Sequence, residues 1–248
     1  MELENNKIII TGASSGIGMA LTNEFLKYRN NTIIAVGRNE KKLIQLSSLS
    51  NNIIPFKCDL ADPLQLEEFV LFIEKEHRDA NILINNAGIQ FNYHFLDEQH
   101  ITSKIKLELD TNLSAPIALI GLLLPTLKLN YQPAIVNISS GLALSPKKQA
   151  PVYCGTKAAL HIFTKSLRYQ LEDVGIRVFE IIPPLVDTEM TKGRGTGKIS
   201  PEDLSREFIK KFKINQYEIP IGKVKWLKLI GRLSPSLTDF IMKKGGEN

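Results

Sequence analysis

The sequence predicts an α/β fold in which a doubly wound parallel sheet of about seven strands carries helices on both faces. Short runs of apolar, β-branched residues recur through the first 182 residues, and stretches of helical periodicity separate them. Runs that are apolar on both sides are typical of parallel strands buried between two helical layers. Because 248 residues with 43% hydrophobic side chains can bury one substantial core, we expect a single domain over residues 1–248.

The elements follow one another at the spacing of βαβ units. We expect strands at 7–11, 31–37, 52–58, 80–86, 133–139 and 176–182. Helices are expected from the first glycine-rich turn to residue 29, at 40–49, from Asp62-Pro63 onward, at 100–128 and at 152–174. Asp62 can cap its helix and Pro63 suits a first helical turn, so that start is well marked.

The regular alternation ends after residue 188. Residues 191–200 hold three glycines and few apolar side chains, which predicts a mobile loop, and 201–213 reads as an amphipathic helix. The stretch 217–222 fits an edge strand, because its proline would break a ladder inside a sheet. Residues 223–244 place Trp226, Ile230 and Phe240 at helical spacing, and Pro235 divides them into two short amphipathic helices, the second capped by Ser234.

Composition excludes several classes of protein. No stretch reaches the roughly 18 consecutive apolar residues of a membrane span, and the N-terminus lacks the positive start of a signal peptide. Cys58 and Cys154 cannot form a disulfide framework, and the four histidines show no metal-ligand spacing. We therefore expect a cytoplasmic protein with no metal site.

Positive charge is concentrated at the end of the chain. Residues 1–188 carry 18 basic and 19 acidic side chains, whereas residues 189–248 carry 13 basic and 7 acidic ones. Three interpretations stay open: a solvated surface, recognition of an anionic substrate, or contact with an anionic membrane.

The stretch "TGASSGIG" follows the first predicted strand and opens a helix. Glycines at these positions let the backbone turn sharply and approach a pyrophosphate, while the helix start presents free N–H groups. The loop therefore predicts dinucleotide binding in a Rossmann-type domain, through Gly12, Ser14, Ser15, Gly16, Ile17 and Gly18.

The end of the second strand indicates which cofactor is bound. An acidic residue there would hydrogen-bond the adenosine ribose, but this chain has Gly37 and Arg38. A guanidinium can pair with a 2′-phosphate, so the sequence favours NADP(H) over NAD(H).

Further motifs appear in a fixed order: "CDL" at 58–60, "NNAG" at 85–88, Asn112 in "DTNLSAP", "ISS" at 138–140, "YCGTK" at 153–157 and "PPLVDT" at 183–188. Together with the glycine loop, this set resembles the short-chain dehydrogenase/reductase family in its branch of about 250 residues. The stretches "NNAGIQ", "PVYCGTKAALHIFTKSLRYQL" and "PPLVDT" resemble the bacterial DltE-type oxidoreductases in particular. The chain departs from the family at Pro183-Pro184, where Pro-Gly is usual; this stiffens the turn without removing a catalytic group.

The resemblance implies a catalytic tetrad. Tyr153 would be the general acid/base, and Lys157, one helical turn on, would lower the tyrosine pKa and hold the nicotinamide ribose. Ser139 would bind the substrate oxygen, and Asn112 would support a proton path to Lys157. Cofactor contacts implied by the same resemblance are Asp59, Leu60, Asn86, Ala87, Gly88, Tyr153, Lys157, Pro183, Val186 and Thr188. Cys154 and Thr156 receive no role.

The expected function is oxidoreduction of a carbonyl or secondary alcohol with NADP(H), by a homodimer or homotetramer that binds no nucleic acid. The substrate pocket is expected to be mainly apolar (Leu142, Leu144, Leu185, Met190 and Phe91), with residues 189–215 as a lid. Alternatives are an NAD(H)-dependent member of the family, a nucleotide-sensing or scaffold protein without turnover, and peripheral membrane contact through 223–244.

Overall fold

The computed structural model describes residues 1–244, without the side chains of residues 239–241, 243 and 244; the predictions made for Phe240 and for 245–248 lie outside the described part. Seven parallel strands form one sheet in the order β3-β2-β1-β4-β5-β6-β7. Their bounds are β1 Lys7–Thr11, β2 Thr32–Gly37, β3 Ile53–Lys57, β4 Ile82–Asn85, β5 Ala134–Ile138, β6 Arg177–Ile182 and β7 Glu218–Pro220. The predicted fold class, with its seven strands, is confirmed.

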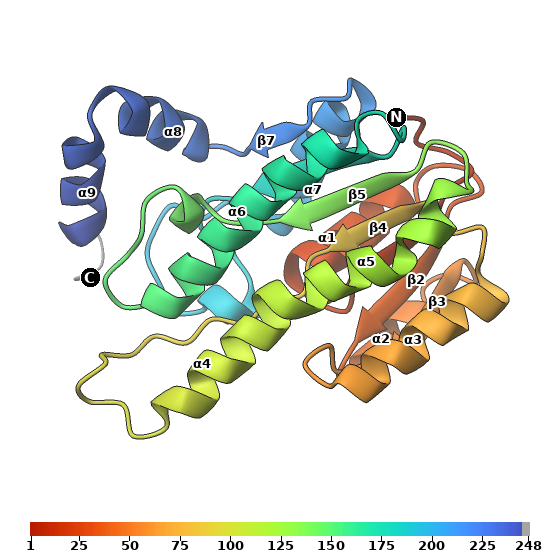
Figure 1. The fold of residues 1–248 in the computed structure, drawn as a ribbon, viewed down its shortest axis with the longest axis horizontal. Helices are drawn as coiled ribbons and strands as arrows, with labels where there is room; N and C mark the ends of the chain where they lie inside the picture. Colours follow the sequence, from red (N-terminus) through yellow and green to blue (C-terminus); the bar gives the residue numbers. More distant parts are fainter. Residues whose placement is uncertain (245–248) are drawn as a thin grey trace.

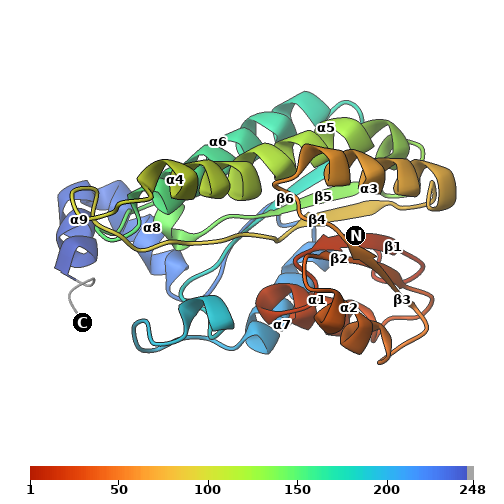
Figure 2. The same cartoon turned by 90° about the horizontal axis from the view of Figure 1, so that it is seen from below.

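Helices cover both faces of the sheet (Figures 1 and 2). One layer contains α3 (Pro63–Glu76), α4 (Ile101–Leu109), α5 (Ala115–Lys128) and α6 (Pro151–Leu171). The other contains α1 (Gly16–Phe25), α2 (Glu40–Ser47) and α7 (Pro201–Lys213). Two apolar clusters result, one against each face of the sheet. The remaining helices, α8 (Val224–Leu233) and α9 (Pro235–Lys244), lie beyond the carboxyl ends of the strands.

The helix expected over 100–128 is interrupted. Between α4 and α5, residues Asp110–Ser114 form a π-helical segment, and short 3₁₀ turns occupy Gly141–Ala143 and Glu189–Thr191. Ile101–Lys128 as a whole is long and apolar enough to cross a membrane by composition. Leu119, Leu123 and Leu127 of α5 are fully buried in the cluster against the sheet, which accounts for that apolar character.

The second half of the predicted lid belongs to the core. In α7, Phe208 and Phe212 are fully buried, and both stack edge-on against Phe25 of α1. The stretch 191–200 is also partly ordered by pairing, because Val186 and Ile199 form a parallel bridge. The part of 189–215 that faces the cavity described below is therefore the short stretch before α7.

Candidate active site

A cavity of about 830 Å³ lies at the carboxyl edge of the sheet. Gly12 follows β1, Asn86 follows β4, Ser139 follows β5 and Pro183 follows β6, and all four line it. The sheet order reverses between β1 and β4, and ligands of open α/β sheets bind at such a switch point. The topology therefore places the site where the sequence motifs converge.

The glycine loop is held against β4 without room for side chains. A Cβ on Gly12 would lie 2.9 Å from Asn86 Nδ2, and Gly12 adopts a φ of +65°. The Asn86 amide donates to the carbonyl oxygens of Thr11 (2.9 Å) and Gly12 (3.2 Å). A Cβ on Gly18 would come within 2.2 Å of the Gly12 carbonyl oxygen, so Gly18 permits close packing of α1 and does not face the cavity.

The start of α1 is a favourable place for an anion. Ser15 precedes the helix in an extended conformation and its side chain makes no capping hydrogen bond, so the N–H groups of the first turn stay available. The helix dipole adds partial positive charge at this end. Ser15, Gly16 and Ile17 all line the cavity, as a pyrophosphate site requires.

A smaller cavity of about 210 Å³ continues from the glycine loop past the end of β2. Ser14, Arg38, Asp59 and Leu60 line it, as the sequence motifs predict for an adenosine site. Arg38 Nη1 lies 3.8 Å from Asp59 Oδ2, an exposed pair of little energetic weight. Lys42 of α2 is a second basic residue here, which the sequence reasoning missed; its Nζ lies 2.6 Å from Glu189 Oε2.

Tyr153 and Lys157 lie one turn apart near the start of α6, and both line the large cavity. Burial raises the pKa of Tyr153 to about 12, opposed chiefly by a hydrogen bond with the Ser140 hydroxyl and also by the charge of Arg194. Burial lowers the pKa of Lys157 to about 8, with Glu180 opposing. Lys157 Nζ donates to the Ile138 carbonyl (2.8 Å) and lies 5.9 Å from the centre of the Tyr153 ring. Burial therefore dominates the pKa of Tyr153, and Ser140 is the main group that opposes it.

Asn112 lies behind the cavity wall in the π-helical segment. Its Oδ1 accepts from Ile89 N (2.8 Å), while its Nδ2 donates to Ile89 O (2.8 Å) and Thr156 Oγ1 (3.3 Å). Thr156 in turn donates to the Tyr153 carbonyl (2.8 Å). Thr156, which received no role from the sequence, thus links Asn112 to the helical turn that carries Tyr153.

The structure corrects the assignment of Ser139. Ser139 is 2% exposed and its hydroxyl donates to the Ile181 carbonyl on β6 at 3.3 Å, whereas the Ser140 side chain acts on Tyr153 and lowers the pKa of that phenol. Ser140 also accepts from Leu142 N (3.1 Å), which fixes its orientation. Side chains alternate along extended backbone, so adjacent serines face opposite ways. Ser140 is therefore the hydroxyl on the side of the Tyr153 phenol.

A partly buried ion pair joins α6 to β6 one helical turn beyond Lys157. His161 Nδ1 is 2.8 Å from Glu180 Oε2, and this hydrogen bond raises the pKa of His161. Glu180 is 1% exposed and raises the pKa of Lys157 as well. Lys157 and His161 are one helical turn apart on α6, and Glu180 meets both from β6.

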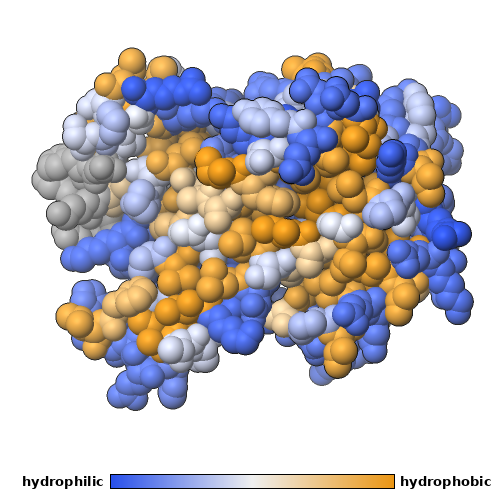
Figure 3. Space-filling model, viewed as in Figure 1, coloured by the Kyte–Doolittle hydropathy of each residue, from blue (hydrophilic) through white to orange (hydrophobic). Residues whose placement is uncertain are grey.

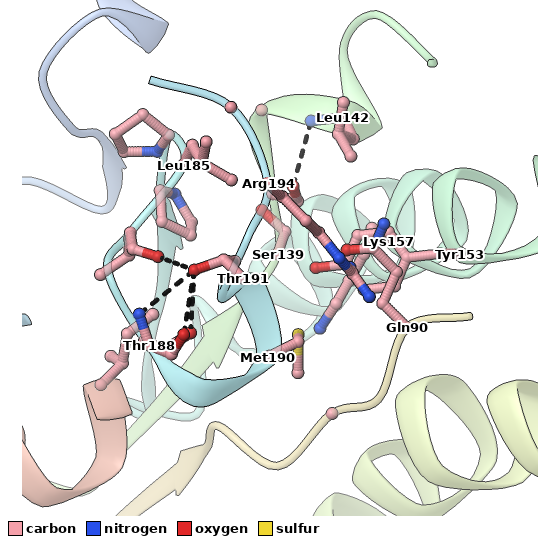
Figure 4. Close-up of a pocket in the computed structure, with 18 of the residues that line it drawn as sticks. Gln90, Ser139, Leu142, Tyr153, Lys157, Leu185, Thr188, Met190, Thr191 and Arg194 are labelled. Carbon is pink, nitrogen blue, oxygen red and sulfur yellow. Dashed lines mark hydrogen bonds between the residues drawn. The ribbon is translucent and has the colours of Figure 1, made fainter. Parts of the chain in front are cut away.

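Most of the predicted cofactor residues line one of the two cavities: Gly12, Ser14, Ser15, Gly16, Ile17, Arg38, Asp59, Leu60, Asn86, Ala87, Gly88, Pro183, Val186 and Thr188. Gly18 and Asn112 support the site from behind. Of the expected substrate-side residues, Leu142, Leu185 and Met190 line the large cavity, as Figure 4 shows, whereas Leu144 and Phe91 do not. Among the side chains that the structure describes, no group of three or more from His, Cys, Asp or Glu could hold a metal ion.

The tail forms one wall of the large cavity. Trp226, Leu227 and Ile230 of α8 line it, and a Cβ on Gly141 would lie 3.0 Å from Val224 Cγ2. Helix α8 thus packs on its own domain through Val224, which is buried. No pattern in the sequence indicated that this helix would reach the catalytic groups.

Comparison with known proteins agrees with this geometry. Residues 6–198 match the family model described as short chain dehydrogenase. The chain is 37% identical over 237 residues to "Uncharacterized oxidoreductase DltE" of Bacillus subtilis strain 168, covering 92% of each chain. It is 30% identical over 200 residues to the NADP-dependent 3-hydroxy acid dehydrogenase of Schizosaccharomyces pombe, covering 79% of this chain and 77% of that protein.

A solved structure shows the same fold. A short chain dehydrogenase from Burkholderia cenocepacia J2315, in complex with NADP, superposes with a TM-score of 0.87 at 22% identity and covers 98% of this chain and 99% of its own. The family model spans more than three quarters of the sequence and includes the glycine loop, Tyr153 and Lys157. The chain therefore belongs to the short-chain dehydrogenase/reductase family of oxidoreductases.

Proposed function

We propose that this protein transfers hydride between NADP(H) and a carbonyl compound or secondary alcohol. The observation that carries the proposal is the meeting of Tyr153, Ser140 and Lys157 in a cavity that is continuous with the glycine loop. A nicotinamide bound there would supply or accept the hydride. The protein's own contribution is to bind the oxygen and move its proton.

The residues divide this work. Ser140 and the Tyr153 phenol are placed to hold the substrate oxygen between them, and Tyr153 donates the proton as the carbonyl becomes a hydroxyl. The phenol is reprotonated through Lys157. Asn112 and Lys157 lie on the same side of Gly88, because a Cβ on Gly88 would be 3.3 Å from Asn112 Oδ1 and 3.6 Å from Lys157 Nζ. Thr156 holds the helical turn between Tyr153 and Lys157 through its hydrogen bond to the Tyr153 carbonyl. Reversal of these steps oxidises the alcohol.

The preference for NADP(H) rests on Arg38 and Lys42, two basic residues on the adenosine cavity. A 2′-phosphate would find both within that cavity, and a relative at 30% identity is named as NADP-dependent. NAD(H) use is the rival within the family. Arg38→Ala should reduce the ratio of NADPH to NADH affinity, measured by fluorescence titration, whereas Lys41→Ala, an exposed change outside the cavity, should not. An unchanged ratio in Arg38→Ala contradicts the argument.

Activity is tested by NADPH oxidation against a panel of carbonyl compounds. Tyr153→Phe should lower kcat by about a hundredfold or more, because it removes the proton donor. Ser140→Ala should lower kcat much more than Ser139→Ala, since Ser140 lowers the pKa of the phenol whereas the Ser139 hydroxyl donates to the Ile181 carbonyl. If no variant, including the wild type, turns over any compound while all bind NADPH tightly, the nucleotide-sensing alternative is favoured.

Assembly and location are proposed on separate grounds. Apolar side chains gather over the centre of the face in Figure 3, where α5 and α6 lie. Leu122, Ile162 and Tyr169 are exposed there, which supports a homodimer or homotetramer formed through these helices. Sedimentation of Ile162→Glu at several concentrations tests the assembly.

Two buried, unpaired cysteines support a cytoplasmic location.

A further inference from the structure

One basic side chain from the short stretch before α7 reaches into the active site. Arg194 lies between Gly193 (φ +74°) and Gly195 (φ +54°), and a Cβ on Gly195 would meet Leu185 Cδ2 at 2.7 Å. Both positions are left-handed, a conformation that favours glycine, and together they set the direction in which the intervening side chain leaves the loop. In Figure 4 that side chain extends across the cavity toward Tyr153 and Lys157.

Arg194 lacks a partner for part of its guanidinium. Its Nη1 is buried and forms no hydrogen bond within the described residues. Its charge acts on two groups of the cavity, because it lowers the pKa of both Tyr153 and Lys147. A buried, unpaired N–H of a cation is costly, and it is satisfied best by an anionic acceptor.

The cavity carries an excess of positive charge. Lys147, Lys157, Lys223 and Arg194 line it, and the one acidic side chain among the described lining residues, Glu189, is bonded to Lys42. Lys147 Nζ donates to Asn92 Oδ1 (3.2 Å), a neutral acceptor, and burial with the nearby Arg194 lowers its pKa. An anion between these side chains would relieve their mutual repulsion.

The rest of the cavity is apolar. Trp226, Leu227 and Ile230 of α8, with Leu142 and Met190, line the space around Tyr153 and Arg194. A ligand that fits must therefore combine an apolar body with a negatively charged group close to its reacting oxygen, because the arginine's charge acts on the Tyr153 phenol itself.

We propose that Arg194 binds the carboxylate of an oxo acid or hydroxy acid substrate, whose apolar side chain packs on α8. The planar guanidinium accepts a carboxylate through two parallel N–H bonds, and Lys147 adds a second positive charge. This inference rests on the proposed carbonyl–alcohol activity and specifies its substrate class.

The test compares an acid with its neutral counterpart. NADPH-dependent reduction of 4-methyl-2-oxopentanoate and of its methyl ester is measured in wild type, Arg194→Gln and Lys192→Gln. Lys192 is exposed on the same loop and does not line the cavity, so it is a matched loss of charge. In wild type kcat/KM should favour the acid, and Arg194→Gln should lower the acid-to-ester ratio by about tenfold or more through a raised KM for the acid. Lys192→Gln should leave the ratio unchanged.

Two results overturn the inference. Equal losses for acid and ester in Arg194→Gln would mean that the arginine acts on Tyr153 or on the loop. A loss confined to NADPH affinity would mean that it binds the cofactor.

A binding measurement separates this inference from the proposed activity. Calorimetric titration of N-isobutyloxamate, a stable oxo acid mimic, into protein saturated with NADP⁺ needs no turnover. Binding to wild type and Lys192→Gln, with loss in Arg194→Gln, supports the inference even if no carbonyl compound is reduced. Reduction of esters without oxamate binding in the wild type supports the activity and refutes the acid site.

Discussion

Replacement of Lys157 by methionine should reveal how far burial of this ammonium lowers the free energy of unfolding. Lys157 is 4% exposed, and burial lowers its pKa to about 8, against about 10.4 for a free lysine. A pKa difference of one between the folded and unfolded states corresponds to about 1.36 kcal/mol, so the buried ammonium destabilises the folded state by about 3 kcal/mol at pH 7. Methionine retains the length and removes the charge.

The sign of the pH dependence follows from proton binding. Below about pH 8 the lysine is protonated in both the folded and the unfolded chain, so the full cost is present. Between about pH 8 and 10.4 the unfolded chain holds a proton that the folded protein has released, and the stability of the wild type therefore rises with pH. Lys157→Met has no such rise. Its own defect, an Ile138 carbonyl left without a donor, costs roughly 1–3 kcal/mol at every pH.

The measurement is urea unfolding at pH 7 and pH 10, followed by circular dichroism. The unfolding free energy of wild type minus that of Lys157→Met should increase by about 2–3 kcal/mol between the two pH values. Lys165→Met, an exposed change in the same helix, should show no comparable increase. The same difference at both pH values would refute the view that burial holds the lysine pKa low.

Two further substitutions probe the supports of the site. Gly18→Ala should abolish NADPH binding and lower the unfolding free energy by about 1–3 kcal/mol, because the new Cβ would collide with the Gly12 carbonyl. Gly155→Ala has open space around it and should instead stabilise α6 by about 0.5–1 kcal/mol. Fluorescence titration measures the binding, and urea unfolding measures the stability of both variants. Thr156→Val should lower kcat about tenfold, because it removes the hydroxyl that joins Asn112 to the helical turn of Tyr153. Thr156→Ser keeps this hydroxyl and should retain activity. A fully active valine variant would show that the link between Asn112 and the Tyr153 turn does not contribute to turnover.

The sequence predicted the fold well because each strand is marked independently. Residues 33–36 and 82–84 are fully buried on both faces, so their apolar runs are unbroken and their positions hardly ambiguous. The interruption of the long helix at Asp110–Ser114 had no such marker, since π-helical and α-helical turns use the same residue types. Asn112 was found through its motif, but its partners depend on that local geometry.

The predicted lid shows another limit. Helical periodicity correctly located 201–213, but periodicity states which side chains share a face and not what that face contacts. Phe208 and Phe212 pack on Phe25, nearly two hundred residues earlier, so α7 is part of the core. In the same way the amphipathic pattern of α8 could not reveal that its apolar face borders the active site.

The choice between Ser139 and Ser140 depended on a single residue of register. A strand that ends at Ile138 points alternate side chains to opposite sides, so an error of one position exchanges the hydroxyl that acts on Tyr153 for one bonded to a neighbouring strand. Both serines are nearly buried and both border the cavity, hence neither composition nor burial separates them. Their partners do so, because the Ser139 hydroxyl donates to the Ile181 carbonyl while Ser140 lowers the pKa of Tyr153.

The surplus of positive charge near the C-terminus divides in a way that the sequence alone could not show. Lys198, Lys225 and Lys228 are paired with acidic partners at Asp187, Glu207 and Glu218, so the charges of these three lysines are neutralised locally. Arg194 has no such partner in the described residues, and its guanidinium lies partly buried beside the acid/base. Solvated, paired charges contribute little to recognition, whereas one desolvated cation can determine which substrate enters. Of the three interpretations of this charge, recognition of an anionic substrate is therefore the one that a specific side chain, Arg194, supports.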